Sequence, residues 1–245
     1  MNDIKKGIDY ASYRPNLDEV KASGYVFVAR YLCALVGTKI ITKAEADDIK
    51  AHGLGLVLVY EQYKRRPLEG RIAGSQDAIV ALAQSIAAGF PSNRPIYFAV
   101  DFDARPADQP AIDEYLRGAA EILGINRVGV YGGINLIDRC FASGTATWFW
   151  QTGAWSYGKE SVHANFVQMT ALNGSVVGGV KVDINETRQP DWGAAFMPTV
   201  TVPTKAELKL IELKIIDPGM DVHGVPSWGA IMWTLYRLLQ ALGKA

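Results

Sequence analysis

"PIYFAVDFD", residues 95–103, begins as a run of apolar and aromatic side chains and ends in two carboxylates. Side chains alternate between the two faces of a strand, so Asp101 and Asp103 share one face. The opposite face carries only bulky apolar side chains, which suits a layer covered by helices. The stretch therefore predicts a buried strand whose two aspartates point inward at its carboxyl end.

Seven further strand-like segments lie between residues 7 and 186. They are "GIDYA" (7–11), "YVFVARYL" (25–32), "LGLVLVYE" (54–61), "RVGVYGG" (127–133), "ATWFWQT" (146–152), "ANFVQMT" (164–170) and "VKVDINE" (180–186). Near-continuous apolar strands are typical of a parallel sheet that is covered on both faces. Eight such strands suggest a closed β/α barrel.

Helical patterns separate several of these strands, at residues 42–53, 74–89 and 108–124. The first has a threonine N-cap and a glycine stop. Only short, glycine-rich stretches separate the last three strands. The fold class that follows is α/β, as a single irregular TIM-like β/α barrel in which loops join strands six to eight.

The pattern changes after Trp192, which predicts a barrel over residues 1–197 and a short C-terminal extension over residues 198–245. Residues 205–217 fit either a pair of strands or a helix. Residues 228–245 carry apolar side chains at helical spacing, which predicts an amphipathic helix. That helix either packs on its own chain or docks on a partner, a second subunit in self-association, or the cell envelope.

The composition excludes several classes of function. The 245 residues carry no formal net charge, whereas nucleic-acid binding needs a basic surplus. The three histidines show no metal-ligand spacing, so neither a metal site nor a cofactor is expected. The two cysteines, Cys33 and Cys140, indicate buried thiols, with a disulfide as the alternative.

The start of the sequence has no apolar segment typical of a signal peptide, and no run is long enough to span a membrane. The sequence therefore predicts a protein that is cytoplasmic until cell lysis releases it, or one that is associated with a virion. In both cases it would act at the cell wall.

Acidic side chains end four of the predicted strands. They are Asp9, Glu61, Asp101, Asp103 and Asp183. No lysine or arginine occupies a matching position on these strands, and uncompensated carboxylates are costly to bury. Such a ring is expected where a proton is transferred. The alternatives are a loop cap at Asp9, an exposed strand end at Glu61, a turn at Asp183, or a ring that holds a divalent metal.

Aromatic side chains gather at the same strand ends, where flat rings suit stacking on sugars. Core packing is the alternative. The candidate substrate-binding residues are Tyr10, Tyr60, Tyr131, Gln151, Trp155 and Asn185.

These motifs resemble a known family. "GIDYASYRP", "YFAVDFD" and "VDIN" are similar to segments of the glycoside-hydrolase family 25 lysozymes. The chain resembles more closely the glycoside-hydrolase-like family catalogued as domain of unknown function 1906, through "GLGLVLVYE", "GFPSNRPIYFAVDFD", "LGINRVGVYGG" and "FWQTGAWS". The resemblance covers residues 5–195 and implies a phage-lysin-like protein.

The resemblance implies cleavage of the bond between N-acetylmuramic acid and N-acetylglucosamine in peptidoglycan. By position, Asp9, Asp101 and Asp183 match acids of the lysozymes. Asp103 departs from the pattern, because those lysozymes have a proton-donating glutamate there. Glu61 belongs to the pattern of the closer family and is a candidate for the missing acid.

Two hypotheses follow. The first is a lysozyme-like glycoside hydrolase that acts on peptidoglycan or another polysaccharide. The second is a non-catalytic carbohydrate-binding or virion structural barrel, which keeps the sugar groove without turnover.

Overall fold

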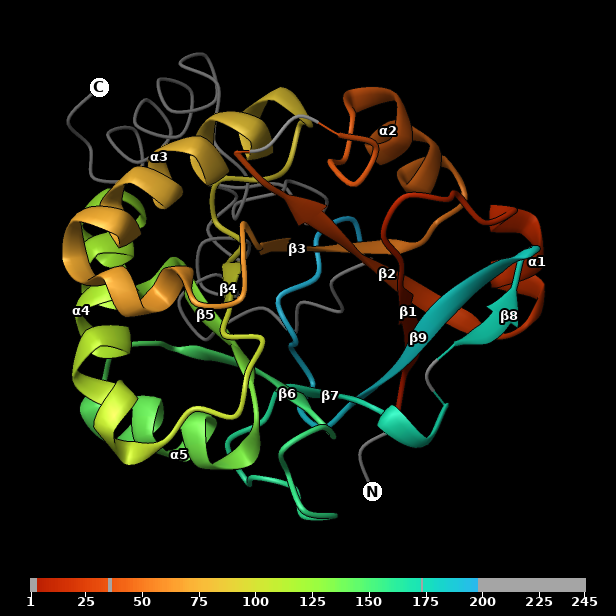
Figure 1. The fold of residues 1–245 in the computed structure, drawn as a ribbon. Helices are drawn as coiled ribbons and strands as arrows, with labels where there is room; N and C mark the ends of the chain where they lie inside the picture. The colour runs from red at the N-terminus through yellow and green to blue at the C-terminus, as the bar shows by residue number, and fades with distance from the viewer. Residues whose placement is uncertain (1–3, 35–36, 173, 198–245) are drawn as a thin grey trace, which may run out of the picture. The chain divides into compact units, whose positions relative to one another are not determined.

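A computed structural model of the chain describes residues 4–34, 37–172 and 174–197. Its centre is a closed barrel of eight strands, drawn in Figure 1. They are β1 (Lys6–Asp9), β2 (Tyr25–Leu32), β3 (Gly55–Tyr60), β4 (Ile96–Ala99), β5 (Val128–Gly132), β6 (Trp148–Thr152), β7 (Phe166–Gln168) and β9 (Val180–Thr187). Neighbours in this order are hydrogen-bonded, and β9 pairs back onto β1. The predicted TIM-like barrel is confirmed.

The closing strand differs from the parallel sheet that the sequence predicts. β9 runs antiparallel to both of its barrel neighbours, β1 and β7. The reversal comes from a hairpin with the short strand β8 (Ser175–Val177), at two glycines with positive φ, Gly178 and Gly179. Apolar and polar side chains alternate alike in parallel and antiparallel strands, so the sequence pattern does not distinguish the two directions.

Helices surround the barrel (Figure 1). They are α1 (Leu17–Ala22), α2 (Lys43–Ala51), α3 (Gly70–Ala87), α4 (Gln109–Leu123) and α5 (Ile134–Ser143), with short 3₁₀ helices at Arg66–Glu69, Pro106–Asp108, Ile125–Arg127 and Thr170–Leu172. The three predicted helices are α2, α3 and α4. Thr42 caps α2, because its side chain accepts a hydrogen bond from the Glu45 amide. Loops and a 3₁₀ helix join β6, β7 and β9, as expected.

The strand side chains form two separate apolar layers. One fills the inside of the barrel and includes Tyr97, Trp150 and Phe166, whose rings contact one another. The other lies between the strands and the helices and includes Phe98 and Val100. The alternation predicted for residues 95–103 is therefore correct as far as Asp101. Aromatic rings therefore pack the inside of the barrel.

The C-terminal extension predicted for residues 198–245, with its amphipathic helix, lies outside the described residues. The domain boundary and self-association through that helix therefore stay predictions. Within the described part of the chain, no helix combines the length and apolarity needed to cross a membrane. Cys33 and Cys140 are both buried and form no disulfide.

Candidate active site

A cavity of about 360 Å³ opens at the carboxyl ends of the parallel strands. Three acids line it, Glu61 after β3, Asp101 after β4 and Asp183 on β9. Rings and polar groups complete its wall; these are Tyr31, Lys39, Tyr131, Trp150, Thr152, Trp155 and Gln168, with the small or aliphatic Val59, Ala99 and Ala154. The barrel thus brings together carboxylates from three strands that are far apart in the sequence.

Asp9 lies behind this wall on β1, with 2% of its surface exposed. It stands directly opposite Asp183 in the antiparallel β1–β9 pair. Its Oδ2 accepts hydrogen bonds from Nδ2 of Asn185 at 2.8 Å and Nε2 of Gln168 at 2.9 Å. Burial, assisted by the charge of Asp183, raises the pKa of Asp9 to about 7, although these hydrogen bonds oppose the change.

Gln168, which the sequence analysis did not select, organises the acids. Its Oε1 accepts hydrogen bonds from the hydroxyls of Tyr131 at 2.8 Å and Thr152 at 3.1 Å. Two hydroxyl donors fix the orientation of the amide, so its Nε2 faces the carboxylates of Asp9 and Asp183. The period-two pattern of "ANFVQMT" places Gln168 on the inner face with Phe166, so the sequence itself indicates that this amide points into the barrel.

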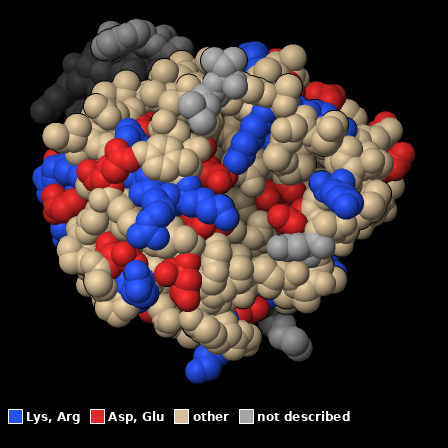
Figure 2. Space-filling model, viewed as in Figure 1, with Lys and Arg blue, Asp and Glu red and all other residues tan. Residues whose placement is uncertain are grey.

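Lysines from loops compensate two of the acids, contrary to the expectation of an uncompensated ring. Lys39, from the loop between β2 and α2, forms an ion pair with Oε2 of Glu61. Nζ of Lys64 lies 3.6 Å from Oδ2 of Asp101. Both lysines lie on loops, so the pattern of the strands does not predict them. Acidic and basic side chains also lie next to one another on the face drawn in Figure 2.

Two acids of the cavity have pKa values above the ordinary range. Burial raises the pKa of Asp101, and the charge of Glu61 raises it further, whereas Lys64 and Lys39 oppose this change. Burial also raises the pKa of Asp183, opposed by a hydrogen bond from the amide of Gly174. Such carboxyl groups hold a proton more readily than free aspartate, which suits proton donation.

Asp103 does not join the other acids. Its Oδ2 accepts a hydrogen bond from the hydroxyl of the exposed Tyr157 at 3.1 Å, and its side chain does not line the cavity. The expectation that both aspartates point inward fails at Asp103 because the chain bends at Phe102, between the two aspartates. Beyond this bend the strand alternation no longer determines the direction of the side chains.

The candidate substrate-binding residues divide into two groups. Tyr131 and Trp155 line the cavity, and Asn185 is buried behind it, where Nε1 of Trp150 donates to Oδ1 of Asn185. Trp155 lies in the loop after β6 with a positive φ of 54°. These three residues therefore lie in or next to the site.

The other three candidates lie elsewhere. Tyr60 faces the helix layer, where its hydroxyl donates to Asp77. Tyr10 donates to Glu45 near α2. Gln151 is buried against residues 159–161, bonding the carbonyl of Lys159 and the amide of Ser161. Tyr60 and Gln151 occupy strand positions whose side chains face away from the barrel axis.

Among residues 4–34, 37–172 and 174–197, no three or more acidic, histidine or cysteine side chains are arranged as ligands for a metal ion. The carboxylates of the site are instead joined to amides, hydroxyls and lysines.

The family described as "Rv2525c-like, glycoside hydrolase-like domain" matches residues 18–187 of this chain. "Putative peptidoglycan hydrolase Rv2525c" from Mycobacterium tuberculosis is 30% identical over 203 residues, covering 76% of this chain and 82% of the relative. The crystal structure of that Tat-secreted protein in complex with L-tartrate is similar with a TM-score of 0.73, covering 78% of this chain and 98% of that one.

Two further solved structures share the fold at lower identity. The autolysin LytC from Streptococcus pneumoniae has a TM-score of 0.60 at 15% identity, covering 77% of this chain and 47% of that one. A family GH25 lysozyme from Aspergillus fumigatus has a TM-score of 0.53 at 13% identity, with coverage of 77% and 95%. The barrel is thus structurally related to those of GH25 lysozymes.

Proposed function

The chain belongs to the family of Rv2525c-like, glycoside hydrolase-like domains, and we propose that it is a cell-wall glycoside hydrolase that acts on peptidoglycan. The observation that carries the proposal is the cavity where Glu61, Asp101 and Asp183 meet the rings of Tyr131 and Trp155. Glycoside hydrolysis requires two carboxyl groups near the scissile bond, and three line this cavity.

In this proposal Asp101 is the general acid. Burial and the neighbouring Glu61 charge raise its pKa, so it holds a proton that the leaving glycosidic oxygen can take. Glu61, from the adjacent strand end, is the anionic partner because Lys39 forms an ion pair with it. Glu61 then stabilises the positive charge that develops on the sugar ring or orients the attacking water. This assignment moves the role of the acid from Glu61, the candidate that the sequence suggested, to Asp101.

The rings supply the binding surface. Tyr131 and Trp155 present apolar faces to the cavity, and sugar rings stack on such faces while their hydroxyls meet polar groups. A lysozyme-like muramidase cleaving between N-acetylmuramic acid and N-acetylglucosamine is the finer form of the proposal. The phage-lysin-like character stays a prediction.

The expected location is corrected. The sequence suggested a protein that is cytoplasmic until lysis or associated with a virion. Rv2525c, which is 30% identical, is a Tat-secreted protein, and this relationship points to export instead. Export places the proposed activity at the cell wall without lysis.

A second candidate function is binding of the wall polymer without turnover. The observation that favours it is Asp103, which stands where the family 25 lysozymes have their proton-donating glutamate and bonds Tyr157 outside the cavity. A barrel without a working acid at either Asp101 or Asp103 would keep its rings and bind sugar only.

Release of reducing ends from purified peptidoglycan tests the proposal. We expect Asp101→Asn and Glu61→Gln each to lower the rate by about 10²–10⁴-fold, because each removes a group that acts on the reacting bond. Asp103→Asn is the matched control, and we expect it to keep the wild-type rate. Wild-type protein that is pulled down by the same walls but releases no reducing ends would establish the binding function instead.

A further inference from the structure

Lys39 is the one cationic side chain among the described residues that line the cavity. Its ammonium group forms an ion pair with Oε2 of Glu61 and lies 4.0 Å from the centre of the Tyr31 ring. Lys39 comes from a loop and not from a barrel strand. The place of its ammonium group therefore depends on what holds that loop.

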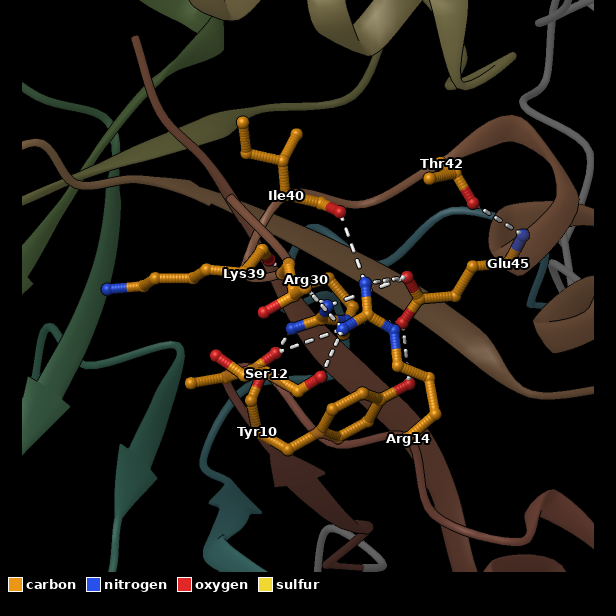
Figure 3. A network of polar contacts seen from close by, with 10 residues as sticks. Tyr10, Ser12, Arg14, Arg30, Lys39, Ile40, Thr42 and Glu45 are labelled. Atoms are coloured by element: carbon orange, nitrogen blue, oxygen red, sulfur yellow. Dashed lines mark hydrogen bonds and ion pairs between the residues drawn. The ribbon is translucent and has the colours of Figure 1, made fainter. Parts of the chain in front are cut away.

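Arg30 on β2 holds the loop from inside. Its guanidinium group is fully buried and bonds Glu45 through Nε at 2.6 Å. The same group donates to the carbonyl of Lys39 from Nη2 at 3.1 Å and to the carbonyl of Tyr10 from Nη1. Figure 3 shows Arg30, Glu45 and the backbone of Lys39 in one network.

Arg14 holds the same loop from outside. Its Nη1 donates to the carbonyl of Thr38 at 2.5 Å, and its Nη2 donates to the carbonyl of Ile40 at 3.1 Å and to Oε2 of Glu45 at 2.8 Å. Three consecutive carbonyls, of residues 38 to 40, thus each accept a hydrogen bond from one of two guanidinium groups. Both guanidinium groups are anchored on the single carboxylate of Glu45 (Figure 3).

Stability alone does not account for this arrangement. The desolvation free energy of a buried ion pair offsets much of its electrostatic attraction. Apolar side chains of similar volume often stabilise a fold equally well. Two guanidinium groups do, however, fix three carbonyls in both distance and direction, which apolar contacts cannot do. Lys39 is the middle residue of the three whose carbonyls are held in this way.

We infer that Arg14, Arg30 and Glu45 form an arginine clamp that positions Lys39 against Glu61, which makes Lys39 a positioning residue of the acid site. The inference deepens the proposed function and rests on it for its catalytic meaning. The clamp keeps the ammonium group on Glu61 while the substrate enters the cavity.

The charged and titratable groups around Lys39 come from several elements. Glu61 follows β3 and Tyr31 lies on β2. The cavity is also lined by Asp101 after β4, Tyr131 on β5 and Asp183 on β9. Lys64 lies beside Asp101, and the hydroxyl of Tyr31 contacts Asp9 on β1. Lys39 lowers the pKa of Asp101, so loss of Lys39 is expected to raise it.

The test uses Lys39→Met, Arg14→Gln and the double variant in the full chain. Lys39→Arg serves as the conservative rescue. Lys43→Met is the matched control, because Lys43 forms an ion pair with Asp47 on the exposed face of α2. Titration of the Asp101 carboxyl by ¹³C NMR gives a readout that needs no turnover, and the pH profile of kcat/KM on peptidoglycan gives the catalytic one.

We expect Lys39→Met to move the Asp101 titration upward by about one pH unit, and the alkaline limb of the pH profile with it. Arg14→Gln moves both in the same direction by less, because the loop still has Arg30. Adding Arg14→Gln to Lys39→Met changes nothing further, since the clamp acts through Lys39. Lys39→Arg restores the wild-type midpoint, and Lys43→Met does not alter it.

An Asp101 titration that Lys39→Met leaves in place would overturn the inference. So would an effect of Arg14→Gln that persists in the Lys39→Met background. Arg14 and Lys39 are each about one-third exposed, so both variants are expected to fold. If the wild type releases no reducing ends, the proposed function fails, while the NMR titration still decides whether the clamp positions Lys39.

Discussion

The side-chain amide of Gln168 donates a hydrogen bond to Oδ2 of Asp9 at 2.9 Å, although 159 positions of sequence separate the two residues. The amide cannot turn around, because its oxygen accepts from the hydroxyls of Tyr131 and Thr152. Asp9 on β1 is thus held by a group on β7 that only the complete barrel brings near. A carboxylate at position 168 would reverse this interaction.

We therefore expect Gln168→Glu to destabilise the protein by about 2–4 kcal/mol, because an acceptor would replace the donor between Asp9 and Asp183. The loss is expected to be larger at pH 8 than at pH 5, where protonation relieves the repulsion. Urea unfolding at the two pH values measures it. The control is Gln189→Glu on an exposed loop, which is expected to change the stability by less than about 0.5 kcal/mol. Equal losses in the two variants would contradict the prediction.

Asp9 itself makes stability depend on pH. Its pKa is about 7 in the folded chain against an ordinary value of 3.8, so between these values the folded state binds more protons than the unfolded state. Stability from this group is fully present below about pH 4 and is lost as the pH rises through 7. The loss amounts to roughly 4 kcal/mol at most.

Asp9→Asn removes this dependence, because the amide carries no charge at any of these pH values. We expect the variant to match the wild type near pH 4 and to exceed it in stability at pH 8. Chemical denaturation of both proteins across this range gives the comparison. A constant difference between wild type and variant from pH 4 to pH 8 would show that Asp9 does not titrate in this way.

Trp155 and Tyr157 offer a matched pair for the binding surface. Both lie in the loop after β6 with φ of 54°, but Trp155 lines the cavity and Tyr157 is exposed outside it. We expect Trp155→Ala to weaken binding to purified peptidoglycan about tenfold, the loss that corresponds to one stacked ring. Tyr157→Ala is expected to bind like the wild type. A sedimentation assay with increasing amounts of wall measures both, and equal affinities would exclude Trp155 from the sugar surface.

Local alternation along strands predicted much of the barrel. It placed Asp101 toward the cavity and Val100 toward the helices, because burial on both faces imposes a period of two wherever the chain is extended. Thr42 likewise marked the start of α2 through its cap. Each of these predictions depends on interactions within a few residues.

The predictions failed where the local pattern ends. Asp103 follows a bend at Phe102, so strand alternation no longer directs it. Lys39 reaches Glu61 from a loop whose course depends on hydrogen bonds from Arg14 and Arg30, neither of which belongs to that loop. The strand ends therefore predict only part of the acid site, because tertiary hydrogen bonds determine where a cation such as Lys39 lies.

The direction of β9 links the closure of the barrel to the assembly of the acids. Asp183 lies opposite Asp9 only when β9 pairs with β1 in the observed register. A slip of one residue would turn Asp183 and Asn185 to the outer face and leave Asp9 without its amide partner. A chain that has formed only its first seven strands has Glu61 and Asp101 but lacks the side of the cavity that Asp183 forms, so partly folded intermediates are expected to be inert toward the wall of the cell that makes them.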